Sequence, residues 1–166
     1  MKNLKKAMLF VLMLVFCFTL TGCKYIEGTS SIAIRVGMDS SDKFSEALSI
    51  VPVGEKSSVT IITNLQSNKQ KKVICKIVVT MNKCDIINYE KDYTTGCIEN
   101  SINISDDKKT IEYQAEVNKN TQTIPIKLQF NFTAAETGSS TIIVRVYDHK
   151  GDLVHSACAE KILTFE

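Results

Sequence analysis

The sequence predicts an all-β protein, an antiparallel sandwich of two sheets that follows an N-terminal signal helix. Three observations favour this class. Segments of alternating apolar and polar residues recur along the chain, polar or glycine-containing turns separate them, and no long stretch has the period of an amphipathic helix. In such a sandwich each sheet buries one face against the other. We expect residues 31–166 to form one domain.

The second half of the chain has the clearest strand patterns. Apolar residues at every second position predict strands over 111–117, 126–132 and 142–146. A hairpin turn over 148–152, in which Gly151 can take a positive φ, leads into a last strand over 154–165. The side chains expected in the core are Ile111, Tyr113, Ala115, Val117, Ile126, Leu128, Phe130, Phe132, Ile142, Val144 and Val146.

The first half begins with a predicted strand over residues 32–36, which Gly37 ends. Residues 39–46 are polar and fit either a loop or one or two turns of helix. The apolar residues around Pro52 predict an edge strand, because proline cannot donate a hydrogen bond to a central ladder.

Two segments rich in valine, isoleucine and threonine come next, joined by a polar loop. They cover residues 59–65 and 73–81 and predict a strand, a turn and a strand. Within 73–81 the odd-numbered residues are all apolar, so we expect that face to be buried and the even-numbered face to be exposed. Residues 82–100 then look irregular and form the longest interruption of the pattern.

One part of the sequence indicates which kind of β-sandwich to expect. Residues 124–152 combine an alternating strand, an Ala-Ala-Glu-Thr-Gly corner over 134–138, a second alternating strand and a Tyr147-Asp148 hairpin. This run resembles the closing strands of immunoglobulin-like and fibronectin-type-III-like modules of bacterial surface proteins. The Cys, Trp and Cys pattern of antibody domains is not kept, because the chain has no tryptophan. The resemblance therefore implies a general immunoglobulin-like sandwich.

The first 22 residues have the form of a secretory leader. Lys2, Lys5 and Lys6 give a basic start, and residues 7–20 are a run of 14 residues in which only Thr19 is polar. This run is shorter than the ~20 residues that a membrane-spanning helix needs. The ending Leu20-Thr21-Gly22-Cys23 resembles the lipobox of bacterial lipoproteins.

That resemblance implies cleavage before Cys23 and attachment of a diacylglyceryl group and a fatty acid such as palmitate to this residue. Residues 1–22 would be the signal peptide and residues 23–30 a lipidated tether. The membrane would be a partner through this anchor, with the protein on the extracytoplasmic face of the cell membrane, or of an outer membrane in a two-membrane envelope. The alternative is conventional cleavage, which would leave Cys23 as an ordinary cysteine.

Charge argues against nucleic acid as a partner. The whole chain has 20 basic and 18 acidic side chains, but three of the lysines lie in the leader. The mature chain would have 17 basic and 18 acidic side chains, a net charge of −1. Its only arginines are Arg35 and Arg145, and no basic stripe with arginines or stacking aromatics is present.

Four cysteines remain after the leader and Cys23. A bond between Cys84 and Cys97 is the favoured pairing, because it would close a loop of 14 residues across the irregular segment. It would leave Cys75 and Cys158 as a second, less favoured pair. The alternative is that some or all four are free buried thiols. A zinc site is disfavoured because none of the four form a Cys-x-x-Cys pair.

The sequence has no pattern typical of an enzyme. No Gly-x-Ser-x-Gly elbow, His-Glu-x-x-His helix or phosphate-binding glycine loop occurs, and the only histidines are His149 and His155. Asp148, His149 and Asp152 fit a solvated turn better than a metal site. We therefore expect no catalytic residue, no metal and no cofactor.

Two hypotheses of function remain open. The first is a non-catalytic interaction module that presents an exposed edge or loop to a protein or polymer of the cell envelope. The second is a small-ligand carrier or sensor that uses the space between the sheets, or residues 82–100, as a pocket. The small number of aromatic residues, 7% of the chain, favours the first.

Overall fold

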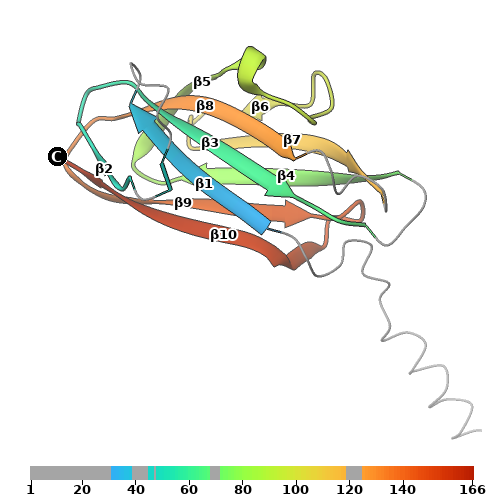
Figure 1. The fold of residues 1–166 in the computed structure, drawn as a ribbon. Helices are drawn as coiled ribbons and strands as arrows, with labels where there is room; N and C mark the ends of the chain where they lie inside the picture. Colours follow the sequence, from blue (N-terminus) through green and yellow to red (C-terminus); the bar gives the residue numbers. More distant parts are fainter. Residues whose placement is uncertain (1–30, 39–44, 47, 68–71, 119–124) are drawn as a thin grey trace, which may run out of the picture.

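Two β-sheets pack face to face in the computed structural model, which describes residues 31–38, 45–46, 48–67, 72–118 and 125–166. The four-stranded sheet has the order β1-β3-β8-β5, and the six-stranded sheet has the order β2-β10-β9-β4-β7-β6. In Figure 1, β1, β3 and β8 cross the upper side of the molecule, and β9 and β10 cross the lower side. The predicted leader, Cys23 and the tether lie outside the described residues.

The described residues form ten strands with the following bounds. The four-stranded sheet contains β1 (Ser31–Met38), β3 (Ser57–Asn64), β8 (Ile126–Ala134) and β5 (Cys84–Tyr89). The six-stranded sheet contains β2 (Ile50–Val51), β10 (Leu153–Phe165), β9 (Gly138–Tyr147), β4 (Val73–Met81), β7 (Thr110–Val117) and β6 (Asn103–Ile104).

The predicted all-β sandwich is confirmed, and the strand pairs in the described part of the chain are antiparallel with one exception. The exception is β2, which pairs with the end of β10 in parallel through Thr164 and Phe165. This short strand is an edge strand, as the residues around Pro52 predicted. After the proline, the Val53 amide donates to the Glu166 carbonyl at 2.9 Å, which fixes the C-terminal end of the chain.

Neighbouring strands in the sequence often belong to different sheets. The strand pair predicted over 59–65 and 73–81 is present as β3 and β4, but β3 pairs with β1 and β8, whereas β4 pairs with β7 and β9. The predicted corner over 134–138 similarly carries the chain from β8 in one sheet to β9 in the other. Gly138 in this corner has a φ of +137°, which favours glycine.

The core lies between the sheets and contains the side chains that the alternation predicted. Phe130 and Phe132 on β8 and Tyr113 on β7 are among the largest fully buried side chains. The odd-numbered face of β4 is also buried, with Cys75, Ile77, Val79 and Met81 all at 0% exposure. The two inner faces therefore form one continuous apolar cluster.

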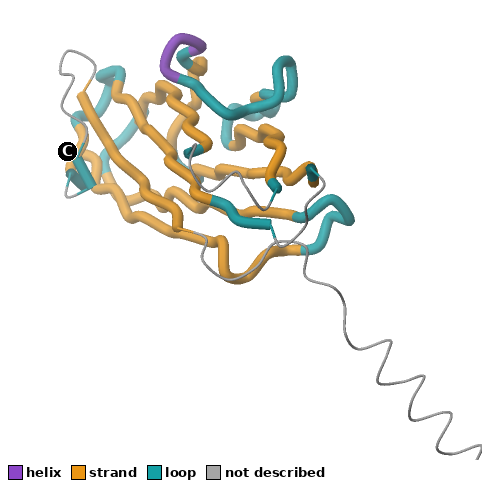
Figure 2. The backbone as a smooth tube through the Cα atoms, turned by 45° about the vertical axis from the view of Figure 1, so that its right-hand side comes forward, coloured by secondary structure: helices purple, strands orange, loops and turns teal. Residues whose placement is uncertain are grey.

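The prediction that residues 82–100 are irregular was wrong for part of this segment. Residues 84–89 form β5, and residues Lys91–Tyr93 form a short 3-10 helix, η1. Figure 2 shows this helix and its neighbouring loops standing out on one side of the sandwich. Two bridges, Thr95 to Lys127 and Cys97 to Ala115, then take the chain from one sheet to the other. The alternation in β5 was too short to predict a strand, because Cys84 and Ile86 are the only buried residues of β5.

Most of the segment for which a helix or a loop was predicted, residues 39–46, lies outside the described residues. Its described end is extended: Ser45 and Val36 exchange backbone hydrogen bonds of 3.0 and 3.1 Å.

On the four-stranded sheet, the side that faces away from the core contains buried polar side chains. The alternation of residues predicted that these side chains would be in solvent. Ser58 donates to the Asn131 side-chain oxygen at 2.6 Å. The Asn131 amide nitrogen donates to Asn88 at 3.0 Å and also to Glu90. Asn131 is 1% exposed, so these bonds satisfy an amide that would otherwise destabilise the fold, and they tie β3, β8 and β5 together.

Replacing Tyr113 by phenylalanine should leave the free energy of unfolding unchanged or raise it by about 1 kcal/mol. The Tyr113 hydroxyl is fully buried and lies near Thr63, but neither hydroxyl has a hydrogen-bond partner of good geometry among the described residues. Urea unfolding of the two proteins measures the difference. A loss of stability above about 1 kcal/mol would show that the hydroxyl has a partner that stabilises the fold.

Candidate functional site

The outward-facing surface of β4, β7 and β9, here called the outer face, mixes apolar and polar side chains. Because β4 buries its odd-numbered residues, Ile74, Lys76, Val78 and Thr80 point to this outer face. The register places Tyr147 of β9 beside Lys76, and Glu112 of β7 beside Val78. The strands thus bring these side chains together in a fixed geometry on the surface of a rigid sheet.

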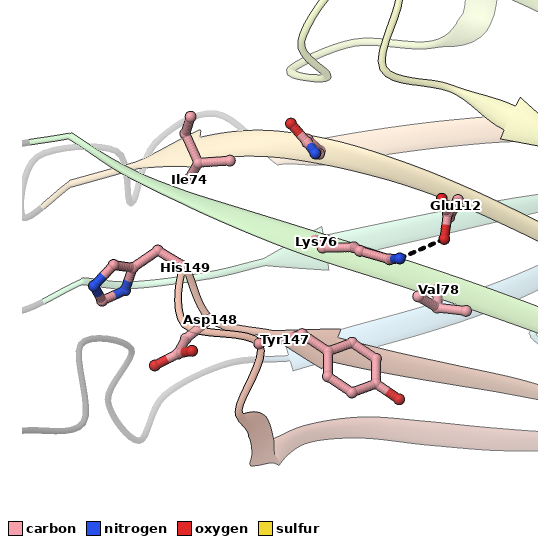
Figure 3. Close-up of a pocket in the computed structure, with 9 residues that line it drawn as sticks. Ile74, Lys76, Val78, Glu112, Tyr147, Asp148 and His149 are labelled. Carbon is pink, nitrogen blue, oxygen red and sulfur yellow. Dashed lines mark ion pairs between the residues drawn. The ribbon is translucent and has the colours of Figure 1, made fainter. Parts of the chain in front are cut away.

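A hollow of about 640 Å³ lies on the outer face at the end where β9 turns into β10. Figure 3 shows Ile74, Lys76 and Val78 from β4, Glu112 from β7, and Tyr147, Asp148 and His149 from the end of β9 and its turn. Gln114 and Gly151 complete the lining. The hollow is open to solvent and lies outside the core. Its apolar side chains, Ile74, Val78 and Tyr147, are those a partner could cover.

One ion pair belongs to the lining of this hollow. The Lys76 ammonium lies 2.5 Å from the Glu112 carboxylate, as marked in Figure 3. A second pair on the same sheet joins Lys72, the residue before β4, to Glu116 of β7 at 2.6 Å. The paired side chains are 38 to 68% exposed, so each pair contributes little to stability. Their positions hold charge of both signs beside the apolar side chains, which suits a polar rim around a contact surface.

The turn after β9 is rigid for local reasons. The Asp148 carboxylate accepts hydrogen bonds from the backbone amides of Lys150 at 2.8 Å and Asp152 at 3.0 Å. Gly151 has a φ of +86°, as the predicted turn required, and its amide donates to the Asp148 carbonyl. Asp148 therefore organises the turn that positions His149 at the edge of the hollow.

The structure forms neither predicted disulfide, which corrects both pairings. All four thiols are free. Cys84 lies on β5 of the four-stranded sheet, whereas Cys97 bridges to Ala115 of the six-stranded sheet. Cys75 points into the core from β4, whereas Cys158 is exposed on β10, with β9 between the two strands. The pairings were predicted from loop length, which does not say on which strands the cysteines lie.

At pH 8, iodoacetamide should modify exposed Cys158 well before the other three cysteines of the sandwich. The thiolate is the reactive form, and burial raises the pKa of Cys75 to about 12 and the pKa of Cys84 and of Cys97 to about 11. Modification of these three should accelerate as the pH rises toward 11, or when the protein unfolds. Peptide mass spectrometry measures the order, and equal rates for Cys84 and Cys158 would contradict it.

The outer edge of β5 is occupied, so it is a poor site for an added strand. The Ile86 amide donates to the Lys108 carbonyl at 2.9 Å. The Lys109 ammonium donates to the Cys84 carbonyl at 3.0 Å and to the Asp85 carboxylate at 2.7 Å. The hydrogen bond from Lys109 lowers the pKa of Asp85. A charged lysine on an edge strand also disfavours pairing with another strand.

The described residues offer no constellation for catalysis or metal binding of the usual kind. They contain no group of three or more histidine, cysteine, aspartate or glutamate side chains placed to hold a metal ion. His149 and His155 are both exposed. In the same part of the chain, no helix is long and apolar enough to cross a membrane.

The hollow was not predicted from the sequence, although a signal for it was present. The exposed face predicted for 73–81 contains Ile74 and Val78, which is unusual for a face that only meets water. Ile74 is 46% exposed. The contributions of β7 and β9 could not be foreseen, because the pattern of one strand does not say which strands lie beside it.

Comparison with known proteins supports the fold. No protein-family model and no curated protein sequence match the chain. The C-terminal domain of the Streptococcus agalactiae AgI/II polypeptide BspA is similar with a TM-score of 0.50 and 9% identity, over 82% of this chain and 49% of that one.

Two cohesins are also similar. One is the cohesin module of a Clostridium perfringens family 33 glycoside hydrolase, with a TM-score of 0.46 and 10% identity over 83% of this chain and 98% of that one. The other is the sixth cohesin of Acetivibrio cellulolyticus scaffoldin B, solved in complex with a dockerin, with a TM-score of 0.46 and 14% identity over 72% and 94%. The chain is an immunoglobulin-like β-sandwich, which is the class that its strands and its corner predicted.

Proposed function

We propose that this protein is a lipid-anchored, non-catalytic interaction module on the extracytoplasmic face of a bacterial membrane, where it binds a protein or polymer of the cell envelope. The observation that carries the proposal is the hollow on the outer face, where Ile74, Val78 and Tyr147 meet an exposed ion pair on a rigid sheet. The leader ending in Cys23 supports the anchor.

The sheet surface is favoured over the strand edge as the contact site. The edge of β5 is occupied by backbone and lysine hydrogen bonds, whereas the outer face presents side chains that are exposed and well positioned. Tyrosine is also enriched among the side chains that dominate binding energy in interfaces, and Tyr147 lies at the margin of the hollow.

The carrier hypothesis has less support. The inner faces of the two sheets are filled by side chains at or near 0% exposure. A pocket does lie beside residues 82–100, lined in part by Tyr89, Cys97 and Ile102, but its volume is about 210 Å³. Pockets for small ligands usually measure ~300 to 1,000 Å³. The interaction module is therefore the better account of the geometry.

Crosslinking in isolated envelopes tests the proposal with matched variants. Tyr147→Ala should reduce the yield of the crosslinked partner at least about tenfold, since truncating a tyrosine that acts as a binding hot spot costs about 2 kcal/mol or more, and tenfold corresponds to about 1.4 kcal/mol. The control is Tyr93→Ala, which removes a tyrosine that is 54% exposed on η1, away from the hollow. Ile74→Ala and Ile87→Ala form a second pair, because these isoleucines are 46% and 48% exposed on different sheets.

The four variants show whether the outer face is the contact site. Loss of the partner in Tyr147→Ala and Ile74→Ala, with retention in both controls, supports the outer face. Equal loss in the controls, or a partner that none of the four changes affects, contradicts it.

A further inference from the structure

Three side chains of the outer-face hollow form a row across neighbouring strands. Lys76 of β4 is the register partner of Tyr147 of β9 on one side (Figure 3) and of Gln114 of β7 on the other. All three line the hollow. Strands lie ~4.8 Å apart, so the row offers an aromatic ring, an ammonium group and an amide over a length of about 10 Å.

The row has hydrogen-bonding capacity that the protein does not use. The Gln114 side chain is exposed, and neither its amide nor the Tyr147 hydroxyl makes a hydrogen bond to the described residues. The Lys76 ammonium has three N–H donors, and its partner among the described residues is Glu112. Donors and acceptors are both present, so a partner rich in hydroxyl groups can bond to every member of the row, because a hydroxyl both donates and accepts.

The charge of the hollow disfavours an anionic polymer. With histidine counted as neutral, its lining has one positive side chain, Lys76, and two negative ones, Glu112 and Asp148. Lys76 is already paired with Glu112 at 2.5 Å. An anionic chain laid in the hollow would therefore meet two carboxylates and a lysine whose charge is balanced, which is poor electrostatic complementarity.

The backbone around the hollow also disfavours a peptide. β9 lies between β10 and β4, and β4 lies between β9 and β7, so neither strand has a bare edge that could pair with an added strand. On β7, the Gln114 carbonyl accepts from the Ile98 amide at 2.8 Å. A helix laid across the face would cover the Lys76–Glu112 pair with apolar side chains and remove its water, which costs free energy. A partner that replaces this water by its own hydrogen bonds avoids that cost.

We propose that the hollow binds an uncharged polysaccharide of the cell envelope, with one sugar ring against Tyr147 and hydroxyl groups bonded to Lys76 and Gln114. This inference rests on the proposed function and narrows its partner to one class. A pyranose ring has a face of C–H groups, which suits the aromatic ring, and a rim of hydroxyls, which suits the polar members of the row. The row is long enough for about two sugar rings laid across the strands.

The test applies the mature full-length protein in detergent to an array of short uncharged oligosaccharides built from glucose, galactose, mannose and N-acetylglucosamine, with uronic acid and phosphate-bearing counterparts beside them. Calorimetric titration with the strongest binder then compares variants whose fold is checked by thermal unfolding. We expect binding to uncharged members, weakened at least tenfold by Tyr147→Ala and at least threefold by Gln114→Ala. Tyr147→Phe keeps the ring and should stay within twofold, as should Tyr93→Ala, which changes an exposed tyrosine on η1.

Four results would overturn the inference: no binding to any uncharged oligosaccharide at millimolar concentration, stronger binding to the charged counterparts, equal losses in Tyr93→Ala and Tyr147→Ala, or equal losses in Tyr147→Phe and Tyr147→Ala. The crosslinking experiment in envelopes tells this failure from that of the proposed function. A crosslinked partner that Tyr147→Ala still removes, in a protein that binds no glycan, would leave the outer face as a contact site and exclude the polysaccharide.

Discussion

Replacing Cys23 by alanine should abolish the incorporation of a labelled fatty acid into the protein. The resemblance of Leu20-Thr21-Gly22-Cys23 to a lipobox makes the Cys23 thiol the attachment point, and alanine has no atom that can accept the lipid. Each buried CH₂ contributes ~0.8 kcal/mol, so two acyl chains anchor a protein that a single chain would leave exchanging. Because Cys23 is the attachment point that the resemblance implies, the loss of label should be complete, and the unlipidated protein should also lose its anchor.

The measurement is growth of cells with an alkyne-labelled palmitate, followed by coupling to a fluorophore and gel electrophoresis. Cys84→Ala is the matched control, since it removes a buried cysteine of the sandwich and leaves the leader unchanged. Label in the control and none in the Cys23→Ala protein supports the anchor. Label that persists in Cys23→Ala would mean that another residue carries the lipid.

The core substitution Phe130→Ala should lower the free energy of unfolding by about 3 to 5 kcal/mol. Phe130 lies at the centre of β8, between Val59 of β3 and Tyr89 of β5, and is 0% exposed. Its ring faces the six-stranded sheet, so alanine would leave a cavity between two layers that cannot fully close. Such a loss is a large part of the stability of a domain of this size.

Urea unfolding of the purified proteins measures this effect, with two controls. Phe130→Leu keeps most of the volume and should cost less than about 1.5 kcal/mol. Thr133→Ala, on the outward face of the same strand, should change stability by less than about 0.5 kcal/mol. Equal losses for Phe130→Ala and Thr133→Ala would mean that the inner face of β8 is not the packed one.

The alternation of residues was enough to predict which face of most strands is buried. In β7 and β8 the apolar positions repeat every second residue over seven or more residues, and in β9 they do so over residues 142–146, so the inner face could be read directly. The turn at Gly151 was equally local, because its backbone geometry depends on a single residue type.

The neighbours of each strand could not be predicted in the same way. A period of two residues states which side of a strand is apolar, but it does not state which strand lies beside it. For this reason β3 and β4 look like a hairpin in the sequence and yet belong to different sheets. The disulfide predictions were wrong for the same reason: Cys84 and Cys97 are near in sequence, but the segment between them crosses from one sheet to the other.

The outer-face hollow depends on the same kind of information. Ile74 and Val78 were visible as apolar residues on an exposed face, but Tyr147 and Glu112 come from strands that are distant in sequence. The buried Asn131 is a further case, since its partners come from two segments distant from it in sequence, Ser58 from β3 and Asn88 and Glu90 from β5 and the residue after it. Alternation assigned it to solvent, and only the sheet order explains its burial.

The central claim is that a lipid on Cys23 tethers an immunoglobulin-like sandwich to a membrane, and the mass of the amino-terminal peptide tests it most directly. The protein is extracted from membranes with detergent, digested, and its first peptide is measured. We predict a peptide that begins at Cys23 and carries the mass of a diacylglyceryl group. A peptide that begins at Cys23 without added mass, or one that retains residues 1–22, would contradict the account.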